Sequence, residues 1–338
     1  MKQNLAPPTL LLLLLISAVL LQTVWACREG NGAANARLDT HPDKRGAAFD
    51  TAAFQKRLQL LANGDRSGRW PVQMENPLNG ALFPFKRVVA FYGNFYCRQM
   101  GVLGAYEPSV MLGKLRQQCR EWQLADTATP VVPAIHYIAV TAQQSPCDGS
   151  YRLRMPAREI EKAMALADSI QGIVFLDVQV GMSTLQKELP LLQPYLRKPN
   201  VHLAIDPEFS MKSGERPGTA IGSFDAADVN YAAAFLAALV QQHQLPPKIL
   251  VVHRFTENML TNYRLIQTRP EVQVVIHMDG FGSPQLKKST YRQFVSRQPV
   301  QFTGWKVFYG NDAIRGGRIT LPDEILLLQP IPVYIQYQ

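Results

Sequence analysis

The sequence has few cysteines and lacks several short motifs that would assign it to a common class of protein. Four cysteines in 338 residues are too few for a disulfide-stabilised scaffold, and no two of them form a Cys-x-x-Cys pair. No Gly-x-Gly-x-x-Gly opens the first helical pattern, and no Gly-x-Ser-x-Gly is present. These absences argue against a dinucleotide-binding sheet and against a serine nucleophile.

The charge is unbalanced, because 35 basic residues face 26 acidic ones and leave a formal charge of +9. Such a surplus suits nucleic acid, an anionic membrane surface or acidic glycans. We find no RNA-binding signature and no helical run of lysine and arginine, so we expect no nucleic-acid partner. The surplus instead favours adhesion to anionic lipid or to a cell-wall surface.

The overall composition is that of a folded protein with a sizeable core. About 47% of the residues are apolar and 18% are charged, which excludes wholesale disorder. A chain of 338 residues suits one large α/β barrel or two ordinary domains.

The N-terminus has the layout of a secretion signal, which we assign to residues 1–26. Lys2 provides the positive charge, residues 9–21 the apolar stretch, and Val24-Trp25-Ala26-Cys27 the processing site. The apolar stretch is too short for a spanning helix. The four residues resemble a bacterial lipobox, so we expect lipidation at Cys27 and an anchor in the cell envelope, with simple secretion as the alternative. By the same resemblance, Arg28 in place of Asp favours the outer membrane if the cell has one.

The rest of the chain divides into two parts. Residues 27–80 are rich in Gly, Ala, Asn, Arg and Asp and contain one helical stretch at 49–61, so we expect a tether and a leading segment that covers the bottom of the domain. Residues 81–338 form the main domain, which we expect to be a monomer.

Short β-branched runs alternate with amphipathic stretches through this domain, as βα units require. Eight such units in about 250 residues predict a (β/α)8 TIM barrel, with an open doubly wound sheet as the alternative. The predicted helices are 111–122, 157–170, 185–196, 226–244, 257–267, 284–296 and 322–328. The predicted strands are 87–92, 131–137, 173–177, 201–205, 249–253, 272–277, 303–309 and 332–337.

Polar residues end the predicted strands on the side that carries small or aliphatic residues further back. Alternation along a strand places them toward the barrel axis at its C-terminal mouth, where TIM-barrel chemistry is located. A single polar strand end is more often a cap, but so many together indicate a site. The predicted inward residues are Tyr92, Asn94, His136, Asp177, Gln179, Asp206, Glu208, His253, His277 and Asp279, together with Tyr309 and Gln336 on the last two strands.

Four of these residues, Asp177, Asp206, Glu208 and Asp279, could act as the paired carboxyl groups that glycoside hydrolysis needs. Asp206-Pro207-Glu208 holds two carboxylates on one strand end, and crowding of like charges raises one pKa toward that of a proton donor. We expect Glu208 or Asp279 to act as the acid, with Asp206 or Asp177 opposite. Substrate would be bound by Tyr92, Asn94, His136, Gln179, His253, His277, Phe281 and Tyr309.

Two other functions remain open. His136, His253 and His277 with Asp177, Asp206 and Asp279 could ligate a metal in a metal-dependent hydrolase or phosphodiesterase, although we expect no metal and no cofactor. A non-catalytic barrel that binds an envelope glycan or cell-wall polysaccharide, or supports another protein, would keep the aromatic residues and tolerate loss of the carboxylates.

Five segments resemble a family of uncharacterised bacterial secreted proteins and lipoproteins with glycosidase-like barrels. They are YGNFYCRQMGVLG (92–104), FLDVQVG (175–181), AIDPEF (204–209), VVHRFTENM (251–259) and HMDGFGSP (277–284). The resemblance covers about residues 86–338 and implies the fold and the location, but no reaction. Relatives commonly have Pro after the Gly-Asn, where this chain has Phe95 and Tyr96.

One disulfide is possible in an oxidising compartment. If Cys27 is an anchor, Cys97, Cys119 and Cys147 remain. Cys97 and Cys147 fall in predicted neighbouring loops of one face, so we prefer that pair. Three unpaired thiols are the alternative.

Overall fold

The computed structural model describes residues 49–338, so the predicted signal, Cys27 and residues 28–48 of the predicted tether and leading segment lie outside the described residues. Its main feature is a nine-stranded sheet in which eight strands run parallel and the short β3 (Arg152–Arg154) is antiparallel to β2. The eight are β1 (Arg87–Gly93), β2 (Val131–Ala142), β4 (Ile173–Val178), β5 (Val201–Ile205), β7 (Lys248–Arg254), β9 (Val272–Met278), β10 (Phe302–Val307) and β11 (Tyr334–Tyr337).

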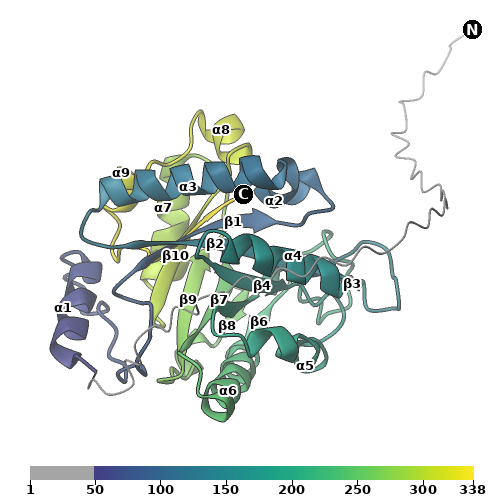
Figure 1. Cartoon of the computed structure of the whole chain (residues 1–338), viewed down its shortest axis with the longest axis horizontal. Coiled ribbons are helices and arrows are strands. Elements are labelled where there is room, and N and C mark those ends of the chain that lie inside the picture. The colour runs from purple at the N-terminus through teal and green to yellow at the C-terminus, as the bar shows by residue number, and fades with distance from the viewer. Residues whose placement is uncertain (1–48) are drawn as a thin grey trace, which may run out of the picture. The chain divides into compact units, whose positions relative to one another are not determined.

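The sheet closes on itself, because β1 pairs with β2 on one side and with β11 on the other. Val88, for example, lies beside both Val132 and Tyr334. The predicted (β/α)8 barrel is therefore confirmed, and each predicted strand is present. Figure 1 shows the strands inside and the helices around them.

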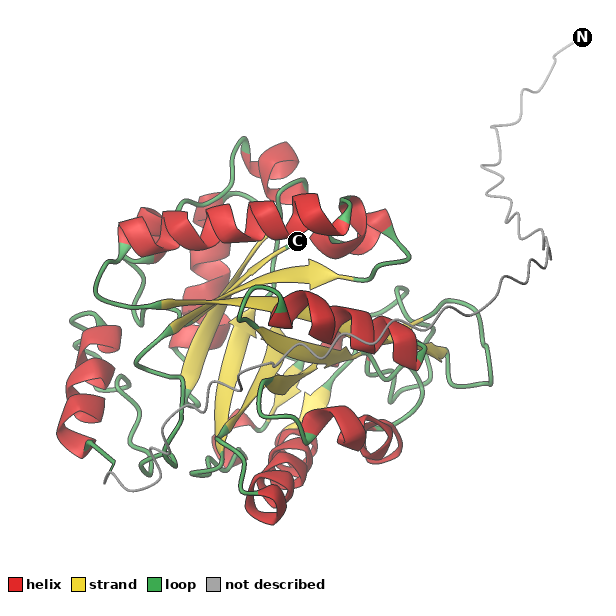
Figure 2. Cartoon of the chain, in the orientation of Figure 1, coloured by secondary structure: helices red, strands yellow, loops and turns green. Residues whose placement is uncertain are grey.

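The helices that follow the strands lie outside the barrel (Figure 2). Among residues 49–338, none has the length and apolar character needed to cross a bilayer. The main ones are α3 (Pro108–Ala125), α4 (Ala157–Asp168), α5 (Leu185–Leu196), α6 (Ala226–His243), α7 (Pro284–Tyr291), which continues as a π-helix (Arg292–Ser296), and α9 (Pro322–Ile325). The shorter α2 (Val102–Ala105) and α8 (Asn311–Gly316) lie in loops.

The helix predicted at 257–267 is wrong. This stretch forms the short strand β8 (Leu260–Thr261), which pairs with β6 (Phe224–Asp225), and a 3-10 turn (Tyr263–Leu265). Asn262 has φ +54°, a left-handed conformation that no helix interior accepts. Thr261 and Asn262 both donate side-chain hydrogen bonds to Oδ2 of Asp225, at 2.7 and 2.6 Å, and so hold the extended form.

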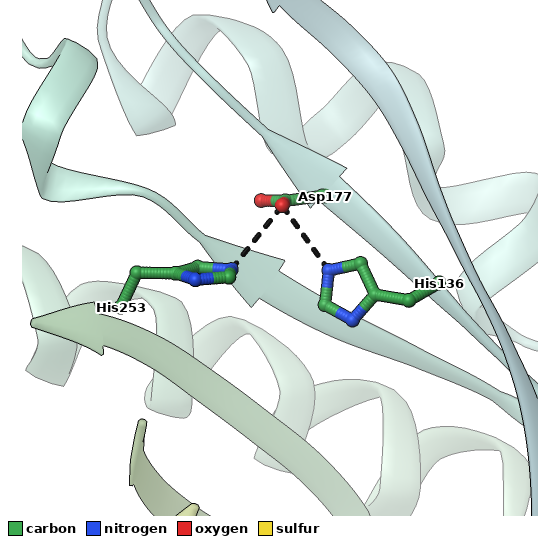
Figure 3. Close-up of side chains that lie close together, drawn as sticks. All are labelled: His136, Asp177 and His253. Atoms are coloured by element: carbon green, nitrogen blue, oxygen red, sulfur yellow. Dashed lines mark hydrogen bonds and ion pairs between the residues drawn. The ribbon is translucent and has the colours of Figure 1, made fainter. Parts of the chain in front are cut away.

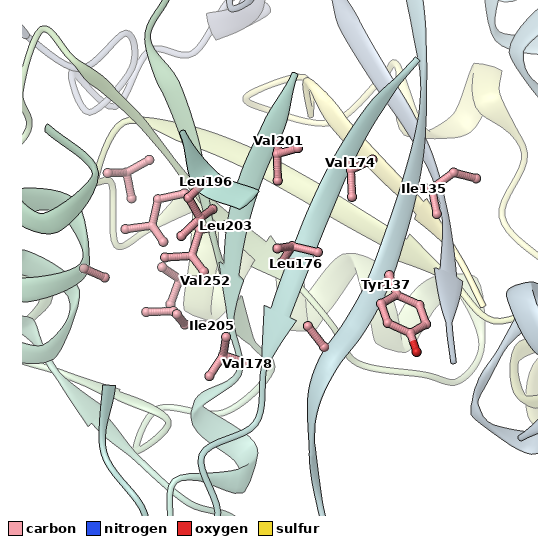
Figure 4. Close-up of a cluster of buried hydrophobic side chains, with 14 of the residues drawn as sticks. Ile135, Tyr137, Val174, Leu176, Val178, Leu196, Val201, Leu203, Ile205 and Val252 are labelled. Carbon is pink, nitrogen blue, oxygen red and sulfur yellow. The ribbon is translucent and has the colours of Figure 1, made fainter. Parts of the chain in front are cut away.

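Two apolar layers follow from the alternation of side chains along the strands. The outer layer fills the space between strands and helices and includes Ile135, Val174, Leu176, Leu203 and Val252 (Figure 4). The inner layer lies within the barrel. Its strand residues include Ala90, Ala134, Phe175, Ala204, Val251 and Val275, the inward positions that the sequence predicts.

The segment before the barrel contributes to the inner layer. Helix α1 (Thr51–Ala62) places Phe54 and Leu58 in the same apolar cluster as Val88 and Phe302. Phe83 joins them and lies 5.4 Å, centroid to centroid, from the ring of Phe302. Because these strand residues lie at the N-terminal ends, α1 covers the end of the barrel opposite the mouth.

The Cys97–Cys147 disulfide is not formed, and both residues, like Cys119, are free thiols in the described part of the chain. Strand β2 is longer than predicted. Gly93, the last residue of β1, pairs with Tyr137, but β2 continues to Ala142. At about 3.3 Å per residue, this extension carries the loop of Cys147 roughly 15 Å beyond the end of β1, where Cys97 follows.

Candidate active site at the barrel mouth

The inner layer becomes polar toward the C-terminal ends of the strands. Immediately above Ala134, Phe175, Val251 and Val275, the inward positions hold His136, Asp177, His253 and His277, all with no exposed surface. A side chain of this kind is buried only with partners, so its hydrogen bonds define the floor of the site.

Asp177 on β4 joins two of the histidines (Figure 3). Its Oδ2 atom lies 3.1 Å from Nε2 of His136 and 3.2 Å from Nε2 of His253. His253 continues the chain through Nδ1, which lies 2.8 Å from Oδ2 of Asp279, and Oδ1 of Asp279 lies 2.8 Å from Nζ of Lys306. One connected network therefore runs across β2, β4, β7, β9 and β10.

The network is balanced in charge. Burial acts to lower the pKa of His253, but the carboxylates of Asp177 and Asp279 outweigh it and raise that pKa to about 10. Burial likewise acts against ionised Asp279, but Lys306 and His253 outweigh it and hold the pKa of Asp279 well below its usual range. Two carboxylates thus face one imidazolium and one ammonium. His253 donates a hydrogen bond from Nδ1 to Asp279 and forms an ion pair through Nε2 with Asp177.

His136 and His277 are neutral. Burial lowers the pKa of His136 to about 4, so its ring donates to Asp177 from Nε2 and accepts at Nδ1 from the Tyr334 hydroxyl. Burial also lowers the pKa of His277. Neither ring nitrogen of His277 has a hydrogen-bond partner among the described residues, and its ring packs edge-on against Tyr334 at 5.1 Å.

A cavity of about 500 Å³ opens above this floor, and its lower part is polar. These polar side chains come from strand ends and contact one another. Nζ of Lys306, for example, lies 4.0 Å from the ring centroid of Tyr92. The network's His136, Asp177 and His253 lie beneath and are not among the described residues that line the cavity. Those that do line it at the floor are Tyr92, Gln179, Asp206, Glu208, Asp279 and Lys306.

Asp206 and Glu208 are held together by a 3-10 turn, Pro207–Phe209, for which Asp206 is the N-cap. Oδ1 of Asp206 accepts a hydrogen bond from the Glu208 backbone N–H at 3.0 Å, and Oδ2 accepts one from Nε2 of Gln179 at 3.3 Å. Gln179 is oriented in turn by the Ala142 N–H, which donates to its Oε1 at 3.0 Å.

Both carboxyl groups of this turn favour the protonated form. Burial raises the pKa of Glu208 to about 7, and the negative charge of Asp279 adds to the effect. Burial also raises the pKa of Asp206 well above its usual value, against the opposing charge of His253. The cavity therefore holds ionised Asp279 together with two carboxyl groups whose pKa values are raised.

Three other residues of the sequence prediction have definite positions. Phe281 lines the cavity at its rim. Asn94 is buried and outside the cavity lining, where Nδ2 donates to the Ile138 carbonyl at 3.2 Å and Oδ1 accepts from the Tyr96 N–H at 2.9 Å. Asn94 therefore fixes the loop after β1.

Tyr309 points out of the barrel. It stacks on Tyr337 at 5.3 Å and donates a hydrogen bond to Gln118 on α3 at 2.9 Å. The inward residues of β10 are instead Phe302, Gly304 and Lys306, one position out of register with the sequence prediction, and a one-residue slip reverses every side chain. Sequence reasoning therefore missed Lys306, although the same alternation counted from Phe302 would have found it.

A metal ion could be held by His136, Asp177 and His253, whose ligand atoms all lie within 4.8 Å of one another. A catalytic metal keeps one coordination position open to substrate. All three residues are fully buried below the cavity, and both histidines contact the same oxygen of Asp177, so an ion there would be structural.

The comparisons with known proteins give no family for this chain. No protein-family model matches it, and no curated protein matches its sequence. A solved structure of a xyloglucan-specific endo-β-1,4-glucanase of family GH5 from a metagenomic library, in complex with cellotriose, covers 67% of this chain and 77% of its own. The identity is 9% and the TM-score 0.36, which is too low to carry an argument.

Proposed function

We propose that this barrel hydrolyses a glycosidic bond at its mouth, with Glu208 as the proton donor and Asp279 as the ionised carboxylate. One observation carries the proposal: Asp206, Glu208 and Asp279, from the ends of β5 and β9, line a single cavity. Glycoside hydrolysis needs one carboxyl group that gives a proton to the leaving oxygen and one that stays charged.

The electrostatics of the cavity support the two roles. Glu208 has a pKa of about 7, so about half of it is protonated at neutral pH, as a general acid requires. Asp279 is kept ionised by Lys306 and by His253, whose own position is fixed by Asp177. Environments that separate the pKa values of two nearby carboxyl groups are typical of acid and base assignments.

The remaining polar residues would position the substrate. Gln179 and Asp206 offer hydrogen-bond donors and acceptors beside Glu208. The hydroxyl of Tyr92 lies 3.4 Å from Nε2 of Gln179 and faces the same cavity. His136, His253 and His277 would act from beneath, as positioning residues that hold Asp279 and Tyr334.

The proposal is tested by a screen of glycans and chromogenic glycosides with the wild-type chain and with Glu208→Gln and Asp279→Asn. On glycans, each variant should lose hydrolysis by at least about 100-fold. On chromogenic glycosides, whose phenolic leaving groups need little protonation, only Asp279→Asn should lose that much. Glu75→Gln and Asp323→Asn, exposed carboxylates outside the cavity, are the matched controls. Binding without hydrolysis by the wild type would favour the non-catalytic glycan-binding barrel, and a stoichiometric metal needed for turnover would favour the metal-dependent hydrolase.

We further propose that the protein is exported and anchored in the bacterial cell envelope through a lipid on Cys27, so that its substrate is an envelope or cell-wall glycan. Lys2, the apolar residues 9–21 and the lipobox-like Val24-Trp25-Ala26-Cys27 support this. Metabolic labelling with a fatty acid should mark the wild-type chain and not Cys27→Ala. Unlabelled wild-type protein in the medium would instead indicate simple secretion.

A further inference from the structure

The rim of the cavity has a different chemistry from its floor. Six apolar side chains line it above the carboxylates, and apart from the weakly accepting methionine sulfur none of them can form a hydrogen bond. They are Met100, Phe209, Phe255, Phe281, Leu286 and Phe308. The charged lining residues come from strand ends or just beyond them, whereas these six come mainly from the loops and short helical turns that follow the strands. The same loops and turns also bring the uncharged polar Gln99, Thr290 and Asn311 to the lining, so the upper level of the pocket is mainly apolar and the lower level charged.

Two members of this rim are strongly exposed. Leu286 on α7 is 56% exposed and Phe281 is 42% exposed. Exposed apolar side chains gathered at the mouth of a pocket mark a surface that a ligand covers. The charged residues of the floor give no reason for exposed apolar side chains at Phe281 and Leu286.

The apolar rim is held rigidly in place. Phe281 and Phe308 pack edge to face with centroids 5.8 Å apart. The carboxylate of Asp312 accepts backbone hydrogen bonds from Gly282 at 2.9 Å and from Phe308 at 3.0 Å, and it forms a buried ion pair with Lys287. One buried carboxylate thus fixes both loops, so the rim needs little ordering when a ligand binds.

A phenylalanine side chain can stack on a sugar through the face of its ring, but it cannot form a hydrogen bond with the sugar's hydroxyl groups. A sugar packed against the six apolar side chains would find no hydrogen-bond partner on them, and would have only Gln99, Thr290 and Asn311 at that level. Each unmet hydrogen bond costs affinity. An aryl, acyl or alkyl group has no such need. The polar floor and the apolar rim together therefore fit a ligand with one sugar and one apolar part.

We propose that the ligand is an amphipathic glycoside, with its sugar on the floor at Glu208 and Asp279 and an apolar aglycone along the rim at Phe281 and Leu286. This inference rests on the proposed function for the identity of the polar part. The cavity volume of about 500 Å³ lies in the range of sites for drug-sized molecules, which is sufficient for both parts.

The test is the affinity of the full mature chain carrying Glu208→Gln for matched methyl and hexyl glycosides of glucose, galactose, mannose and N-acetylglucosamine, measured by calorimetry below the micelle concentration. For the sugar that binds, the hexyl glycoside should bind at least about tenfold more tightly than the methyl glycoside. Phe281→Ala and Leu286→Ala should each reduce that ratio severalfold. Leu191→Ala, an equally exposed leucine on α5 (52%), should leave it unchanged.

Equal affinity for methyl and hexyl glycosides overturns the inference, as does a ratio that neither rim variant changes or a lack of binding by every hexyl glycoside. Turnover of the same glycosides by the wild type distinguishes failure of this inference from failure of the proposed function. If the wild type hydrolyses methyl and hexyl glycosides at equal rates, the proposed reaction stands and the proposed apolar subsite is wrong. If the hexyl glycoside binds more tightly but is not hydrolysed by the wild type, the proposed apolar subsite stands and the proposed reaction is wrong.

Discussion

The ammonium group of Lys306 lies 2.8 Å from Oδ1 of Asp279, and both side chains are almost fully buried at the mouth of the barrel. This contact, with His253 on the other carboxylate oxygen, keeps Asp279 charged in a place where burial alone would protonate it. Glu208 lines the same cavity without such a cation in hydrogen-bonding contact among its described interactions, and its pKa is raised. Lys306 and His253 also act to lower the pKa of Glu208, but burial and the charge of Asp279 outweigh them there. The difference between the two carboxyl groups thus follows from the direct contacts of Lys306 and His253 with Asp279.

Removal of the lysine should show this directly. Lys306→Met leaves Asp279 with one cationic partner, so we expect the free energy of unfolding to fall by about 3 kcal/mol, because a buried ion pair has lost one member. Urea unfolding measures the change. Lys187→Met, an exposed lysine on α5, should change it by less than about 0.5 kcal/mol. Similar results for the two variants would contradict the role of Lys306.

The activity should fall as the pH rises through about 7. Glu208 must be protonated to act as an acid, and its pKa in the folded protein is about 7. A pH profile of kcat/KM for the wild-type chain measures this fall in activity. A rate that stays constant from pH 5 to pH 9 would exclude Glu208 as the proton donor.

Glu208 should also affect stability. Its pKa rises from 4.5 to about 7 on folding, so its contribution to stability is fully present below pH 4.5 and is lost as the pH rises through about 7. Glu208→Gln removes the group that must lose its proton. The free energy of unfolding of the variant minus that of the wild type should therefore be up to about 3 kcal/mol larger at pH 8.5 than at pH 4.5, as measured by urea unfolding. A difference independent of pH would show an unperturbed carboxyl group.

Two buried histidines should respond oppositely to the same substitution. His253→Leu leaves Asp177 and Asp279 without their shared cation and should destabilise the fold by about 3–5 kcal/mol. His277→Leu removes a ring whose nitrogens have no partner in the described chain, so it should be nearly neutral or stabilising. Chemical denaturation of both variants measures the contrast, and equal losses would refute the charge assignment of the network.

The helix at the closed end of the barrel should be essential to the fold. Phe54→Ala empties a fully buried position in the inner cluster, and we expect a loss of about 3–5 kcal/mol. Leu60→Ala, on the same helix but 55% exposed, is the control. A loss below about 1 kcal/mol for Phe54→Ala would show that α1 is only an appendage.

The sequence was sufficient to predict the barrel, because a barrel strand must alternate between an inner and an outer layer. The small or aliphatic residues at Ala90, Ala134 and Ala204 and the polar residues beyond them follow that rule. Residues 257–267 could not be assigned in this way, because their conformation depends on Asp225, which is distant in sequence.

The candidate site was predicted in part, for physical reasons. His136, Asp177 and His253 are inward, as the alternation requires, but sequence could not separate residues that line the cavity from those that lie beneath it. The sequence does not identify Lys306, because the polar Tyr309 predicts a register for β10 that differs by one residue from the one observed. The free Cys97 and Cys147 reflect the length of β2, which has no marker in the sequence.

The central claim is tested most directly by the leaving-group dependence of kcat/KM for Glu208→Gln and Asp279→Asn. An activated phenolic glycoside needs little protonation of its leaving oxygen, whereas an alkyl glycoside of the same sugar needs a proton donor. We predict that Glu208→Gln lowers kcat/KM by at least about 100-fold more for the alkyl than for the phenolic glycoside, and that Asp279→Asn lowers both alike. Equal losses for the two substrates with Glu208→Gln, or no loss with either variant, would contradict the account.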